Sequence, residues 1–161
     1  MTFVLDTCSL INLCNGGVLL HVLRLPNLAF CVGPSVSFEA KSLIAELKPL
    51  LDGGLMFQLD SEIMSAVTYL DFKTRFGLGD GETECMAGAQ QFGYSIVCDD
   101  AAARKAASEL LGDQRVTGSI GLLRMCVSSG LLSAEQGFAA YQLMLQSGAF
   151  LPKLTQRELF T

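Results

Sequence analysis

The chain has 161 residues, of which 50% are hydrophobic and 17% are charged, and its net charge is −5. This length fits one globular domain covering residues 1–161, and the composition excludes an intrinsically disordered protein. The negative charge argues against broad electrostatic capture of nucleic acid. Eight basic residues can still form a local rim: Lys41, Lys48, Lys73, Arg75, Arg104, Lys105, Arg115 and Arg124.

The N-terminal apolar run does not have the features of a targeting segment. No basic residue precedes it, and Asp6 interrupts it. No apolar run elsewhere reaches the length of a membrane span. We therefore expect a cytoplasmic protein with no membrane partner.

The cysteine and histidine content limits the metal chemistry. The six cysteines form no C-x-x-C pair and lie in apolar stretches, as expected of small buried side chains in a reducing cytosol. The chain has a single histidine, His21, which we expect on a helix surface, so we do not expect a zinc site of the His/Cys kind.

Strands and helices are predicted to alternate along the first half of the chain. Short apolar runs indicate buried strands, and apolar residues at helical intervals indicate helices. Ser35 is a plausible helix cap, and Pro49 with the following Gly53-Gly54 pair is expected to end that helix. The predicted segments are strands at 2–5 and 29–32 and helices at 8–23, broken near 15–17, and at 35–47.

The same alternation continues in the second half. A glycine-bearing loop at 77–81 is predicted to open a helix, and Thr117 is a candidate cap for a later one. Strands alternating with helices predict a mainly parallel sheet covered on both faces. The predicted segments are strands at 55–59 and 95–98 and helices at 61–76, 82–92, 101–111, 119–127 and 134–146.

Carboxylates follow two of the predicted buried strands. Asp6 closes the first strand, and Asp99 and Asp100 close the strand at 95–98. The carboxyl ends of parallel strands meet at one edge of the sheet, where ligands bind. A buried or converging carboxylate must be paired, protonated or bound to a metal. The pattern therefore predicts a divalent-metal site, although Asp6 can also be read as a simple helix cap.

Two glutamates are expected to join this site. Glu39 lies at the edge of the apolar stripe of its helix. Glu82 shares a helical face with Cys85, Met86 and later apolar residues and is expected to point inward, whereas Glu84 falls nearly opposite, toward solvent or the rim of the site. Glu82 at a helix start can also simply complement the helix dipole.

Asp99 and Asp100 are adjacent, and capping one helix requires only one of them. One of Asp99 and Asp100 is expected to cap the helix that starts at Ala101, which leaves the other free to act. We favour Asp100 as the metal ligand and keep Asp99 in the site.

Four segments together resemble the PIN domain family, in the branch with a G-E-x-E-A-type helix start and a D-D-x-x-x-R strand end. The resemblance covers residues 3 to about 150 and includes the later Gly118 segment and the helices from about residue 119. The segments are Val4-Leu5-Asp6-Thr7-Cys8-Ser9-Leu10-Ile11, then Glu39, then Gly81-Glu82-Thr83-Glu84-Cys85-Met86-Ala87, then Val97-Cys98-Asp99-Asp100-Ala101-Ala102-Ala103-Arg104.

The resemblance implies a three-layer α/β/α fold and cleavage of single-stranded RNA supported by Mg²⁺ or Mn²⁺. It also implies the toxin of a VapC-like toxin–antitoxin pair, often a homodimer inhibited by a small antitoxin protein. Carried over, the family's acids are Asp6, Glu39, Glu82 and Asp100, with Asp99 adjacent. Residues expected to contact substrate are Thr7, Ser9, Lys41, Arg104 and Lys105.

Two positions depart from the wider family. The third acid is more often aspartate, and Cys98-Asp99-Asp100 replaces the usual Thr-x-Asp. These departures favour one alternative, a PIN-like binding or regulatory module whose acids serve as caps. Another alternative is a metal-dependent phosphatase with Asp6 as nucleophile. Such enzymes of the haloacid dehalogenase kind have a second aspartate two residues later, where this chain has Cys8.

Overall fold

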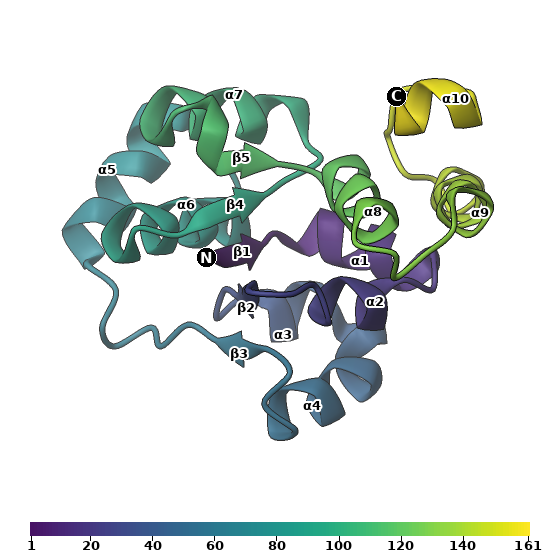
Figure 1. Cartoon of the computed structure of the whole chain (residues 1–161). Helices are drawn as coiled ribbons and strands as arrows, with labels where there is room; N and C mark the ends of the chain where they lie inside the picture. The colour runs from purple at the N-terminus through teal and green to yellow at the C-terminus, as the bar shows by residue number, and fades with distance from the viewer.

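The computed structural model describes residues 1–161, apart from the side chains of Ser37 and Phe38. Its centre is a five-stranded sheet in the order β3-β2-β1-β4-β5, and every neighbouring pair is parallel. Figure 1 shows the strands stacked in this order, with α5 on one side of the molecule and α8 and α9 on the other. The strands are β1 (Thr2–Leu5), β2 (Ala29–Val32), β3 (Phe57–Gln58), β4 (Ser95–Val97) and β5 (Val116–Thr117).

Helices connect the strands and cover the sheet. Before β4 they are α1 (Thr7–Asn15), α2 (Leu19–Leu23), α3 (Val36–Glu39), the 3-10 turn η1 (Lys41–Leu43), α4 (Ile44–Asp52), α5 (Ala66–Phe76) and α6 (Asp80–Phe92). After β4 they are α7 (Ala101–Leu111), the 3-10 turn η2 (Asp113–Arg115), α8 (Ser119–Ser128), α9 (Ala134–Gln146) and α10 (Gln156–Phe160).

The two faces of the sheet carry separate hydrophobic cores, because successive strand side chains point to opposite faces. Phe3 and Leu5 of β1 pack with residues of α1, α2, α8 and α9. Val4 packs on the other face with residues of α6 and α7. The expected three-layer α/β/α fold is therefore confirmed.

Several predicted boundaries were wrong in detail. The helix expected over 35–47 is divided into α3, η1 and α4, and Pro49 lies inside α4 rather than ending it. A proline inside a helix leaves one carbonyl without its partner, here that of Ala45. Ala45 and Pro49 are both exposed, so water can reach that carbonyl. The helix ends at Gly53, and α10 was not predicted.

The order of the strands sets the position of the candidate site. β1 lies between β2 and β4, and the Asp6 backbone N–H donates to the Val97 carbonyl at 3.0 Å. The residues that follow β1 and β4 are therefore neighbours at the carboxyl edge of the sheet. None of the described helices is long and apolar enough to cross a membrane.

Candidate active site

Asp6 is the most buried carboxylate of the candidate site, with 1% of its surface exposed. It caps α1, because its Oδ1 accepts from the Ser9 backbone N–H at 2.7 Å. Its Oδ2 is buried without a hydrogen-bond partner. The cap interpretation and the site interpretation of Asp6 are therefore compatible, since capping occupies one oxygen and leaves the other.

Burial controls the ionisation of Asp6. The loss of hydration and, to a smaller extent, the charge of Asp99 raise the pKa of Asp6, which reaches about 6. The Cys98 thiol and Ser9 act in the opposite direction and lower the pKa of Asp6. A nearby cation stabilises the charged form of a buried carboxylate whose pKa is raised.

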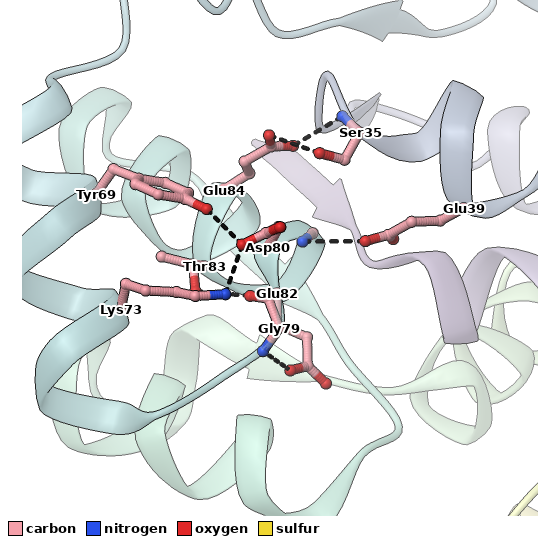
Figure 2. A network of polar contacts seen from close by, with 10 residues as sticks. Ser35, Glu39, Tyr69, Lys73, Gly79, Asp80, Glu82, Thr83 and Glu84 are labelled. Atoms are coloured by element: carbon pink, nitrogen blue, oxygen red, sulfur yellow. Dashed lines mark hydrogen bonds and ion pairs between the residues drawn. The ribbon is translucent and has the colours of Figure 1, made fainter.

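Glu39 joins three elements. Its Oε2 accepts from the Thr7 hydroxyl at the start of α1, and its Oε1 accepts from the Gly81 backbone N–H of α6 at 3.1 Å. Figure 2 shows the Glu39 carboxylate reaching from α3 toward the N-terminus of α6. The Glu39 side chain therefore bridges the ends of two helices beside Asp6.

Glu82 faces the same pocket from α6. Its Oε2 accepts from the Gly79 backbone N–H at 2.9 Å, so it also helps to cap its own helix. A pocket of about 270 Å³ separates these side chains. We call it the acid pocket; it is lined by Asp6, Thr7, Cys8, Glu39, Gly79, Gly81 and Glu82.

Glu84, which was expected to face solvent or the rim of the site, has a carboxylate bonded to Ser35 rather than free in solvent. It is half-buried and accepts from the Ser35 backbone N–H at 2.8 Å and from the Ser35 hydroxyl at 2.7 Å. Figure 2 shows this contact on the side of α6 away from Glu82. Ser35 therefore bonds to Glu84 instead of capping α3 with its side chain.

One of Asp99 and Asp100 was expected to cap the helix that starts at Ala101, and Asp100 does so; Asp99, expected to be free, has structural partners of its own. Asp100 caps α7 by accepting from the Ala103 N–H at 2.8 Å. Asp99 Oδ1 accepts from the Ser119 N–H at 2.8 Å, and its Oδ2 accepts from the Ser119 hydroxyl and from Asn12 Nδ2. Two helices, α7 and α8, begin beside this pair, and each takes one aspartate.

The polar partners of Asp99 were missed at the level of sequence. Asn12 is buried on α1 between Leu10 and Leu13, and Ser119 is fully buried at the start of α8. A polar residue inside an apolar helical run was the available signal for Asn12. No local signal pairs residues so far apart along the chain.

Cys8 is exposed, which contradicts the expectation that all six cysteines are buried; Cys14 is half-buried, and the remaining four are buried and free. Cys8 lines the acid pocket and also a second pocket that contains Asp99 and Asp100. Partial burial, together with the charges of Asp6, Glu82, Asp100 and Asp99, raises the pKa of Cys8 to about 11. Cys8 therefore lies between two pockets that are both lined by acids.

The predicted substrate contacts differ in their surroundings. Thr7 is on the wall of the acid pocket, whereas Ser9 is completely buried and its hydroxyl has no partner. Arg104 donates to the Cys98 carbonyl at 3.1 Å. Lys41 and Lys105 are exposed.

The donor set suits a hard divalent cation, which prefers oxygen ligands. The buried, unpartnered Oδ2 of Asp6 is the atom that most requires one. Among the residues that the structure describes, no three His, Cys, Asp or Glu side chains converge tightly enough to hold an ion on their own. Mg²⁺ usually keeps several waters and needs only one or two carboxylates, so the residues fit this ion.

Comparison with known families gives one match that covers nearly the whole chain. A family model described as a PIN domain matches residues 2–160. The chain belongs to the PIN domain family. No curated protein and no solved structure gives a match. PIN domains are generally nucleases that act on nucleic acid with divalent metal ions.

Proposed function

We propose that this PIN domain is a metal-dependent endoribonuclease that cleaves single-stranded RNA. The observation that carries the proposal is Asp6, a carboxylate that is 1% exposed and has an unpartnered oxygen. Burying such a group costs free energy, and Ser9 and the Cys98 thiol offset only part of this cost, because the pKa of Asp6 remains raised. A function that brings a cation to Asp6 explains why the residue is an aspartate.

Mg²⁺ or Mn²⁺ is the proposed cofactor, with Asp6, Glu82, Asp99 and Asp100 as candidate ligands. When bound, the ion would offset negative charge on the phosphate and make a water molecule more acidic. Asp99 is bonded to α1 and α8, so its orientation is held. Asp100 is exposed at the start of α7.

Glu39 has a different proposed role. Its two hydrogen bonds, to Thr7 and to Gly81, hold the carboxylate at the acid pocket. A carboxylate held in this way can accept a proton from a water molecule or orient it toward the phosphate. Thr7 is then a positioning residue that acts through Glu39.

Single-stranded RNA is the proposed substrate because an unpaired chain can turn its phosphates and bases into narrow pockets. Because the net charge of the chain is −5, the attraction of RNA has to come from individual basic side chains near the site and not from the overall charge of the protein. Arg104, Lys105 and Lys41 are the candidate contacts. We extend the proposal to a cytoplasmic VapC-like toxin that forms a homodimer and binds a small antitoxin protein. This extension is supported by the resemblance to that branch of the family.

The test is RNA cleavage together with metal-dependent stabilisation. The native chain should cleave a labelled single-stranded RNA with Mn²⁺ but not with EDTA, and Mn²⁺ should raise its melting temperature. Asp6→Asn should lose both effects. Asp113→Asn, which changes an exposed acid on η2, is the matched control and should keep both.

Other outcomes would contradict the proposal. Absence of cleavage and of any thermal shift with Mn²⁺ would favour the binding or regulatory module. Hydrolysis of a small phosphate ester without RNA cleavage would favour the phosphatase alternative.

A further inference from the structure

Three pockets lie in a row at the carboxyl edge of the sheet, and each shares residues with the next. The acid pocket shares Cys8 with a middle pocket of about 210 Å³, which also contains Asn12 and Asn15. The middle pocket shares Asp99 and Phe150 with a third pocket of about 420 Å³, which we call the arginine pocket because it contains Arg104 and Arg124. The middle pocket is therefore a neighbour of both the acid pocket and the arginine pocket.

Phe150 stands on the wall between the middle and arginine pockets. It follows α9 in the connection to α10, and its side chain is 98% exposed. An exposed phenyl ring gives up the free energy that burial would provide. The aromatic contacts of the described residues do not include Phe150. Both faces of the ring are therefore available to a ligand.

The two arginines of this pocket are not equivalent. Arg124 is committed to the fold, because its Nε donates to the Leu159 carbonyl at 2.6 Å and its Nη2 to the Glu158 carbonyl at 3.1 Å. Arg104 makes one bond, to the Cys98 carbonyl. No ion pair among the described residues includes Arg104. Its remaining N–H groups are therefore the ones that can bind an incoming anion.

We propose that Phe150 and Arg104 form a nucleotide subsite, in which Phe150 stacks on a base and Arg104 binds a phosphate of the same RNA strand. The inference rests on the proposed function, because the strand that reaches this subsite is the one that passes the acid pocket. Aromatic stacking combined with a positively charged contact is the general mode of single-strand binding. Stacking also explains how a chain with a charge of −5 can hold RNA.

The first experiment uses the absence of tryptophan from the chain. Phe150→Trp introduces a single tryptophan, whose emission can be excited apart from that of the three tyrosines. Titration with a single-stranded oligoadenylate in EDTA should quench this emission, because base stacking alters indole fluorescence. Val67→Trp is the matched control, since Val67 is 79% exposed on α5, on the opposite side of the molecule (Figure 1). Equal quenching of both variants, or of neither, would overturn the subsite.

The second experiment measures affinity by fluorescence anisotropy of a dye-labelled version of this oligoadenylate. Phe150→Ala should weaken binding about tenfold and Phe150→Tyr should restore it, because tyrosine keeps the aromatic face. Arg104→Gln should weaken binding and reduce its salt dependence by about one phosphate contact. An unchanged affinity in Phe150→Ala would overturn the subsite.

The outcomes separate the subsite from the proposed function. If the native chain cleaves RNA with Mn²⁺ and Phe150→Ala binds RNA normally, the subsite is wrong and the function stands. If the native chain neither binds nor cleaves RNA, the function is wrong and the subsite fails with it. If Phe150→Ala changes only the oligomeric state measured by light scattering, the ring is a protein contact and the subsite is overturned.

Discussion

The Thr7 hydroxyl donates a hydrogen bond to the Glu39 carboxylate and so links the start of α1 to the end of α3. The same carboxylate accepts from the Gly81 N–H at the start of α6. Three helices that begin or end at the sheet edge therefore meet at one side chain. The orientation of Glu39 depends on both partners, which makes its role testable without changing Glu39 itself.

Thr7→Val removes the hydroxyl and keeps the shape of the side chain. Glu39 then loses its anchor on α1, and RNA cleavage should fall about ten- to a hundredfold, as for residues that orient ligands. The free energy of unfolding should change by less than about 1.5 kcal/mol. Thr74→Val, on the exposed face of α5, should leave cleavage unchanged. Full activity in Thr7→Val would show that Glu39 does not depend on Thr7.

Gly81→Ala tests the other anchor. An added Cβ would lie 2.4 Å from Glu39 Oε2 and 2.6 Å from Oε1, so the carboxylate has to move. The atoms that have to move belong to the end of the flexible Glu39 side chain, so the backbone can stay in place. In addition, alanine in a helix is favoured over glycine by about 1 kcal/mol. We therefore expect cleavage to fall at least about tenfold while thermal stability is kept or raised. A parallel loss of stability and activity would instead indicate a general disturbance of α6.

Asp6→Asn should change how stability depends on pH. Because the folded-state pKa of Asp6 is raised from 3.8 to about 6, ionisation opposes folding once the pH rises through this interval. The variant should match the native chain below about pH 4 and exceed it by about 2–3 kcal/mol above about pH 6. Asparagine also caps helices, so the cap on α1 is retained. Denaturant unfolding in EDTA at several pH values measures the difference, and a constant difference would contradict the raised pKa.

Asparagine substitutions at positions 99 and 100 should distinguish the roles of the two aspartates in stability and in cleavage. Asp99→Asn places an amide group among the donors of Asn12 and Ser119 and should cost about 1–3 kcal/mol of stability. Asp100→Asn should leave stability within about 0.5 kcal/mol, because asparagine caps helices as well as aspartate does. If Asp100 is a metal ligand, its variant should still lose cleavage about a hundredfold. Cleavage at the native rate in Asp100→Asn would exclude it as a ligand.

The local pattern was sufficient to predict most elements of the fold. The strand at 2–5 and the helices at 101–111 and 134–146 match β1, α7 and α9. The sequence signals for these elements are local, because the spacing of apolar residues and helix propensity depend only on residues close together in the chain. The division of the helix over 35–47 was missed, because α3 and η1 carry no strong breaker between them.

The sequence by itself determined an alternating α/β chain whose parallel strands carry Asp6, Asp99 and Asp100 at their carboxyl ends, because strand and helix periodicity and the order of elements are local properties. Only the tertiary structure decided which polar groups the acids meet. Asp99 lies beside Asn12 and Ser119, Glu39 beside Thr7, and Glu84 beside Ser35. These partners are separated along the chain by 20 to 87 residues, so packing of the helices on the sheet, and not spacing, brings them together.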